Sequence, residues 1–208
     1  MATSERTKKV VLGAAAARVV LGLVAIPLAP LLYEDHFLVL VLLRPTKEVF
    51  LAGGYLVRNG DLRWVELFAA QIPLAVLGVW LFFLMGRLYA REISSGKMPP
   101  LAQRILKPDK VKKIQGILER RGAKLVFLGR LAVLSSATVA AAAGSSEMDE
   151  RRFLPADGAG SIASFAEAAG AGYVLGEAYE RSGPWLTVVG FVALAAFAIL
   201  LGHYLKKS

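Results

Sequence analysis

Charged side chains interrupt two long apolar stretches of this sequence, and such residues can bind an ion or transfer a proton where water is scarce. The first stretch, His36–Val57, is broken at residues 44–48, which read Arg-Pro-Thr-Lys-Glu. The second stretch, Lys124–Gly144, contains Arg130 and Ser136. A charge at the centre of a bilayer costs roughly 2.5–3.5 kcal/mol even on lenient scales, so an ionisable group there favours a functional role.

Two further carboxylates, Asp157 and Glu167, lie in the stretch Phe153–Gly176, which is rich in glycine and alanine. Its small residues include Gly158, Gly160, Gly172 and Gly176. Small residues allow helices to approach closely, so we expect this stretch to run through the interior of a helix bundle. The two carboxylates would relay protons there or would pair with Arg151 and Arg152 near the ends, and the sequence leaves both open.

Other reactive side chains are scarce. The chain has no cysteine, which excludes disulfides, thiolate nucleophiles and cysteine-ligated metals. Neither of its two histidines, His36 and His203, belongs to an HExxH pattern. Since no nucleophile–base pair or metal-ligand cluster is visible, we predict neither an enzyme nor a bound cofactor.

The composition indicates a membrane protein. Hydrophobic residues make up 56% of the chain and charged residues 20%, against about 45–50% and about 25% in soluble domains; the mean hydropathy is +0.53. The net charge of +9 comes from basic residues beside apolar segments, where they meet anionic lipid headgroups. We predict one all-α membrane domain over residues 1–208, with membrane lipids and not nucleic acid as its partners.

Four stretches are long enough to cross a bilayer as helices, which takes about 20 mostly apolar residues. They are Val10–Leu32, Leu62–Met85, Phe153–Gly176 and Pro184–Tyr204. Arg18 lies near one end of the first of these. We expect its side chain to extend to the membrane surface.

The first interrupted stretch is too short on each side of its break to cross. Phe37–Leu43 and Val49–Val57 correspond to about 10–14 Å of helix, which is less than half a bilayer. Pro45 cannot continue a helix, and the charges around it would not face lipid. We therefore predict a re-entrant hairpin over about residues 36–57, which enters the membrane and leaves on the same side.

The charges of the loops decide whether the second stretch crosses the membrane or forms a re-entrant hairpin. Arg87–Ala123 is the most basic segment of the chain, and short basic loops stay in the cytoplasm. Four spans with two re-entrant hairpins place this segment and both termini in the cytoplasm, whereas six spans would export it. We therefore predict a second re-entrant hairpin over about residues 124–144, which enters from the opposite face.

Within the basic segment, apolar residues from Val111 onward recur at helical spacing among lysines and arginines. This pattern predicts a basic amphipathic helix that lies on an anionic leaflet. The alternative is a solvated cytoplasmic connector.

Two hairpins that enter from opposite faces resemble the inverted repeats of secondary transporters, whose binding sites lie near the bilayer midplane. In that arrangement Glu48 and Arg130 come together away from water. The alternative is an ion pair that only holds one hairpin against the other.

The order of motifs from Gly122 to Gly176 resembles the DedA family, the bacterial branch of the VTT-domain superfamily. That family has a glycine, an apolar run into an arginine, an Ala-Gly, a methionine, a phenylalanine and a closing Gly-Tyr-x-x-Gly. The residues that match are Gly122, Val126–Arg130, Ala143-Gly144, Met148, Phe153 and Gly172–Gly176. Upstream matches are Glu48 with Ala52–Gly54 and Gly60, and then Gly86-Arg87.

The resemblance implies a role in membrane homeostasis. Members of this family are implicated in moving lipid-linked phosphates, such as polyprenyl phosphate or phospholipids, often with dependence on the proton-motive force. It implies that Arg130 binds an anionic headgroup, for which the guanidinium fork is suited, and that Glu48 is the hairpin carboxylate. It also implies a bacterial plasma membrane location.

The chain departs from the family pattern at two charged positions. Where the family commonly has Arg-Phe-x-Pro-x-x-Arg, Val133 and Ser136 stand at the proline and second-arginine positions. Val79 follows Gly78 where the family often has aspartate. Asp157 stands where asparagine is common, and is a candidate replacement for the missing carboxylate.

We therefore expect a translocator, or flippase, of a lipid or lipid-linked phosphate. The residues expected to bind the substrate are Arg44, Glu48, Arg130, Ser136 and Asp157. The candidates for proton coupling are Glu48, Asp157 and Glu167. The alternative is a non-transporting membrane scaffold that keeps the fold but lacks part of the site.

Overall fold

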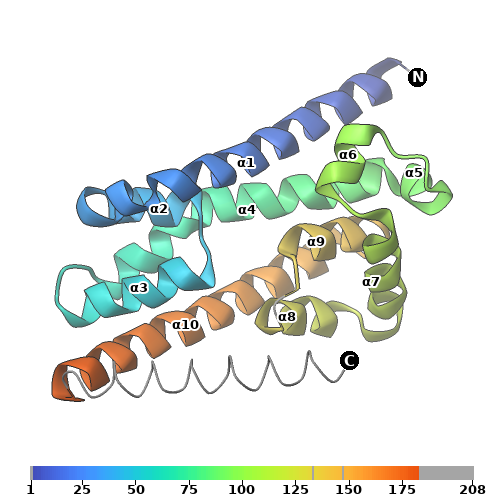
Figure 1. Ribbon diagram of the computed structural model, residues 1–208. Helices are drawn as coiled ribbons and strands as arrows, with labels where there is room; N and C mark the ends of the chain where they lie inside the picture. Colours follow the sequence, from blue (N-terminus) through green and yellow to red (C-terminus); the bar gives the residue numbers. More distant parts are fainter. Residues whose placement is uncertain (1, 133, 147, 183–208) are drawn as a thin grey trace, which may run out of the picture.

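The computed structural model describes residues 2–132, 134–146 and 148–182, and this part of the chain contains helices and no strand (Figure 1). The helices are α1 (Ala2–Asp35), α2 (Phe37–Leu43), α3 (Lys47–Arg58), α4 (Trp64–Leu88), α5 (Ala90–Ser95), α6 (Pro100–Ile105), α7 (Pro108–Arg121), α8 (Ala123–Leu131), α9 (Ser136–Ser145) and α10 (Glu150–Ser182). The all-α prediction is confirmed for these residues. The fourth predicted span, Pro184–Tyr204, lies outside them.

Three long helices form the frame of the molecule. Two of them, within Glu5–Asp35 of α1 and Trp64–Leu88 of α4, are long and apolar enough to cross a membrane, each with a mean hydropathy of 2.2. The third, α10, has 33 residues, or about 50 Å at roughly 1.5 Å per residue. It contains the predicted span Phe153–Gly176, but because of its charges and small residues it is less apolar than α1 and α4 and is not among the helices apolar enough to cross a membrane.

The outer face of α1 is apolar. Val20, Leu23, Val24 and Leu31 are 55%, 57%, 50% and 69% exposed. A contiguous apolar face of this kind is unfavourable in water and is the normal surface of a protein in lipid. The exposure pattern therefore agrees with the membrane character that the composition predicts.

Each interrupted stretch folds as two short helices with a break between them. In the first stretch α2 ends at Leu43, and α3 begins at Lys47 after Pro45. In the second stretch α8 ends at Leu131 and α9 begins at Ser136. Figure 1 shows the chain reversing at both breaks, with the two breaks approaching the middle of the molecule from opposite ends.

The second arm of each hairpin packs against the long helix that follows the other hairpin. The α3 arm lies on α10, where Gly54 and Gly172 bring the two backbones into contact. A Cβ atom on Gly54 would lie 1.8 Å from the Ala169 carbonyl oxygen, and one on Gly172 would lie 1.8 Å from that of Leu51. No side chain fits at either position, so glycine is required by space.

The α9 arm lies on α4 in the same way. A Cβ atom on Gly86 would lie 2.0 Å from the Ala141 carbonyl oxygen, and one on Gly144 would lie 1.9 Å from that of Phe83. These reciprocal glycine contacts fix each hairpin against the opposite half of the fold. Of the four glycines predicted to allow close packing on α10, Gly158 has no neighbour of this kind.

Two separate clusters of buried apolar side chains flank the breaks. One includes Phe50, which stacks on Phe165 with ring centroids 4.3 Å apart. The other includes Phe83, which stacks on Phe153 at 4.9 Å. Neither cluster contains the described residues of the two breaks, which leaves the polar hairpin tips between them.

The basic helix predicted from Val111 onward is present as α7, but its apolar side does not face a leaflet. Val111 and Leu118 are 0% and 2% exposed within one of the two cores, and Ile114 packs against the same cluster. The apolar side of α7 packs against α8 and α9. The short connections before and after α7 hold it against the bundle. The lysines and arginines of α7 are exposed.

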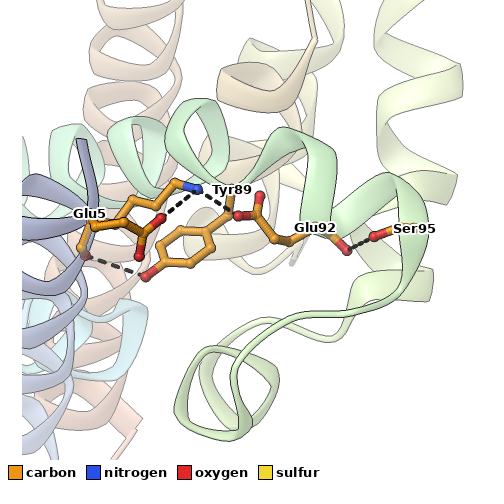
Figure 2. Close-up of polar contacts among 5 residues, drawn as sticks. Glu5, Tyr89, Glu92 and Ser95 are labelled. Carbon is orange, nitrogen blue, oxygen red and sulfur yellow. Dashed lines mark hydrogen bonds and ion pairs between the residues drawn. The ribbon is translucent and has the colours of Figure 1, made fainter. Parts of the chain in front are cut away.

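The beginning of α1 is tied to α5 by a polar cluster (Figure 2). Lys8 Nζ donates to Glu92 Oε1 at 2.6 Å and lies 3.6 Å from Glu5 Oε1. The hydroxyl of Tyr89 donates to the backbone carbonyl of Lys8 at 3.4 Å. Partial burial disfavours the charged form of Glu92, but hydrogen bonds from Lys8 and from its own backbone outweigh this and hold the pKa of Glu92 below its usual value.

Replacing Glu92 is expected to make the stability of the fold less dependent on pH in the acid range. Because the folded pKa is depressed, the ion pair stabilises the fold above the unfolded value of about 4.3, and this contribution disappears as pH falls through the lower folded pKa. Glu92→Gln should lower the midpoint of thermal unfolding at pH 7, with the difference from wild type shrinking below about pH 4. Glu119→Gln, on the exposed side of α7, is the control. A difference that stays constant from pH 8 to pH 3 would contradict the assignment.

The glycine contacts predict opposite effects for two substitutions on the same helix. Gly172→Ala forces a methyl group against the backbone of α3 and should destabilise the protein by about 1–3 kcal/mol or more. Gly158→Ala has open space and should be neutral or stabilising by about 0.5–1 kcal/mol, since alanine is the better helix former. Thermal unfolding of both purified variants in detergent measures this. Equal effects would show that α3 and α10 are not in backbone contact.

Candidate functional site

A cavity of about 370 Å³ lies where the two breaks meet α1, α4 and α10. Its polar lining consists of Arg18, Arg44, Thr46, Arg130, Ser136 and Ser161. The rest of the wall is mainly apolar and includes Leu23, Ile26 and Phe82. Guanidinium groups and hydroxyls in a largely apolar pocket form a site suited to an anion that carries a hydrocarbon group.

Arg130 forms a bidentate ion pair with Asp157. The Nε and Nη2 atoms of Arg130 donate to Oδ1 and Oδ2 of Asp157 at 2.8 Å and 2.6 Å. The two side chains are only 15% and 6% exposed. The pair joins the end of α8 to the first half of α10, and its short, charge-assisted bonds orient the guanidinium at the cavity wall.

The expected contact between Glu48 and Arg130 is not formed. Glu48 is exposed in the first turn of α3, and Asp157 takes the position beside Arg130. The carboxylate considered as a replacement is therefore the one that pairs with the arginine. Pairing of Asp157 with Arg151 or Arg152 is likewise not observed, since both arginines are exposed.

The two hairpins do contact each other, through Lys47. Its Nζ donates to the carbonyl oxygen of Leu131, the last residue of α8, at 3.4 Å, and to Glu167 Oε2 at 3.4 Å. Glu167 is 66% exposed in its side chain and does not line the cavity. Glu48 and Glu167 therefore lie outside the cavity, whereas Arg44, Arg130 and Ser136 line it.

Arg18 points into the cavity and not toward the membrane surface, which corrects the sequence-based expectation. Its Nη1 donates to the carbonyl oxygen of Leu43 at 3.1 Å, and its Nε donates to that of Leu74 at 3.4 Å. Leu43 ends α2, so its carbonyl has no partner within the helix and attracts a donor. Gly78 provides the space, because a Cβ atom there would lie 3.3 Å from Arg18 Nε.

The sequence contains a pattern that could have predicted the inward position of Arg18, although hydropathy alone does not show it. Arg18 lies on an apolar helix, and Gly78 and Leu74 lie on a second one, so a cation and a small residue were available to face each other. Thr46 and Ser161 were also missed. Hydroxyl residues are common in membrane helices and their spacing carries no comparable signal.

A comparison with protein-family models gives a match to the VTT domain over residues 45–174. The protein belongs to the VTT-domain family. The match covers more than half of the 208 residues and confirms the DedA resemblance, since this is the domain of the DedA and SNARE-associated family. It runs from the first break into the second half of α10 and leaves out α1, which carries Arg18.

No curated protein and no solved structure matches the chain. The geometry of the cavity is therefore the evidence for the site residues of this VTT-domain protein.

Breaking the Arg130–Asp157 pair from either side should destabilise the fold strongly. Removing one partner leaves an unpaired, largely buried charge, which typically costs about 3–5 kcal/mol. Arg130→Gln and Asp157→Asn should each have this effect, and the double variant should lose less than the sum of the two. Unfolding in mixed micelles measures the three free energies. Glu167→Gln, at the exposed Lys47 pair, should change stability by less than about 1 kcal/mol. Strictly additive losses would contradict the pairing.

Proposed function

We propose that this VTT-domain protein translocates a lipid or lipid-linked phosphate, such as polyprenyl phosphate or a phospholipid, and does not catalyse a covalent reaction. One observation carries the proposal: the guanidinium groups of Arg18, Arg44 and Arg130 line one cavity between two broken helices. Phosphate oxygens accept paired N–H donors from guanidinium groups more strongly than neutral acceptors do.

The cavity walls favour a lipid over a free anion. Leu23 and Ile26 line the cavity and are 57% and 45% exposed on the outer side of α1. In a membrane these side chains contact lipid tails. A headgroup in the cavity would keep its tail in the bilayer along this edge, so only the charged part of the substrate leaves its lipid environment.

The proposed membrane arrangement follows from the same features. We place α1, α4 and α10 across the bilayer with Pro184–Tyr204 as the fourth span, and we treat α2–α3 and α8–α9 as re-entrant hairpins. The apolar outer face of α1 supports the first assignment, and the approach of the two breaks from opposite ends supports the second. The basic segment Arg87–Ala123 and both termini then face the cytoplasm of a bacterial plasma membrane.

Asp157 is the best placed of the three carboxylates considered for proton coupling, because it alone bonds to a cavity arginine. An anionic headgroup competes with Asp157 for the Arg130 guanidinium. Protonation of Asp157 removes the competing charge and releases Arg130 to the headgroup. Proton binding and anion binding thus support each other, which is what coupling to a proton gradient requires.

Transport by variants that lack the Arg130 charge is the direct test. Arg130→Gln combined with Asp157→Asn removes both charges and leaves no buried ion unpaired. In proteoliposomes with labelled lipid phosphate, we expect its flux to fall roughly tenfold or more, since a hydrogen bond to a charged group is worth about 1.5–3 kcal/mol. Arg63→Gln, whose side chain is 82% exposed, is the matched control. Wild-type flux from the double variant would refute the role of Arg130.

A non-transporting scaffold is the second candidate, and one observation favours it. The family positions for a second arginine and for an aspartate are held here by Ser136 and Val79, which both line the cavity. The remaining Arg130 is neutralised by Asp157. The scaffold function would be supported if the wild-type protein moves no lipid in vesicles and yet restores envelope integrity to cells that lack the protein.

A further inference from the structure

We propose that Arg18 sets the headgroup charge that the cavity accepts, so that a dianionic phosphate monoester is preferred over a monoanionic phosphodiester. The inference rests on the proposed function and adds a specificity-determining residue from α1. This residue lies outside the matched VTT domain, which begins at residue 45.

The charge of the cavity lining supports this preference. Among the described side chains that line it, Arg18, Arg44 and Arg130 are cationic, and Asp157 neutralises one of them. Three positive charges less one negative charge leave two. Glu48 and Glu167 are exposed and do not line the cavity, and Glu167 is itself bonded to Lys47. Glu48 attracts Arg44 from outside the cavity, where its exposure to solvent screens the interaction. In a largely apolar site, unmatched charge is costly, so the bound anion should carry a similar charge.

Headgroups differ in this respect. A phosphate monoester carries about −1.5 to −2 charges at pH 7, because its second pKa is near 6. A phosphodiester has no second ionisable oxygen and carries about −1. The cavity as it stands matches the monoester. Without Arg18 a single surplus cation remains, and that matches the diester.

The contacts of Arg18 also support its role in binding an anion. Both of its acceptors are neutral carbonyl oxygens, those of Leu43 and Leu74, so its charge is held in place without being cancelled. Of the five N–H donors of a guanidinium, these two bonds occupy two. Gly22, another residue of the cavity wall, lies beside the guanidinium, and a Cβ atom there would be in ordinary contact with Arg18 Nη1 at 3.6 Å. Donors on Arg18 are therefore available to an anion.

The test compares two lipids with identical acyl chains, phosphatidic acid as the monoester and phosphatidylglycerol as the diester. Flux of each labelled lipid is measured in phosphatidylcholine proteoliposomes at pH 7.5. We expect the wild type to prefer the monoester by roughly tenfold, the size of one charge-assisted hydrogen bond. Arg18→Gln should lower the ratio to one or below, and Arg18→Lys should retain most of the preference because the charge remains.

A purely structural role for Arg18 predicts a different result. Loss of the bonds to Leu43 and Leu74 would slow both lipids equally, and Arg18→Gln would leave the ratio unchanged. That outcome overturns the inference while the proposed function stands. A wild type that moves neither of these lipids nor polyprenyl phosphate overturns both. Arg63→Gln is the charge control and should keep the wild-type ratio.

A second variant covers the case in which Arg18→Gln does not fold. Gly78→Ala places a methyl group 3.3 Å from Arg18 Nε, so the guanidinium must move by a few tenths of an ångström while its charge remains. We expect the monoester preference to fall severalfold with the diester flux largely retained. An unchanged ratio in Gly78→Ala, with Arg18 displaced, would also overturn the inference.

Discussion

The carbonyl groups at the broken helix ends are the constraint on which the rest of the structure depends. A helix that stops inside an apolar environment leaves backbone acceptors without partners, and each must be satisfied by protein or water. The Leu43 carbonyl at the end of α2 accepts a hydrogen bond from Arg18, and the Leu131 carbonyl at the end of α8 accepts one from Lys47. Both donors come from other helices. Each break is therefore stabilised by a cation supplied from elsewhere in the fold, as the negative end of a helix dipole also favours.

This local requirement gives the centre of the molecule its chemistry. Arg18, which caps the first break, lines the cavity together with Arg44 and Arg130, and Asp157 pairs with Arg130. Surplus positive charge in an apolar site is unfavourable for the empty protein and favourable once an anion enters. Under the proposed function Arg18 both caps a helix end and faces the bound anion, so a variant at Arg18 tests both roles at once. Separating the two effects requires a comparison of ligands, since stability alone responds to either.

Rigid placement of the breaks depends on backbone contact between helices. Gly54 with Gly172, and Gly86 with Gly144, let each hairpin lie directly against a long helix of the opposite half. In lipid there is no hydrophobic driving force between helices, so close packing of small residues is the main source of attraction. Any residue larger than glycine would move the hairpin tips apart. Lys47 would then lose its bond to the Leu131 carbonyl.

The sequence by itself determined the helical class, the position of the first break and the family, because apolar run length, Pro45 and motif order are properties of the local chain. It also identified Arg130 and Asp157 as candidates. Only the tertiary structure decided that these two residues pair, that Glu48 stays outside the cavity and that Arg18 turns inward. The physical reason is that each of these depends on which helices pack together. A local pattern shows that a buried charge needs a partner, but long-range packing selects which partner it finds.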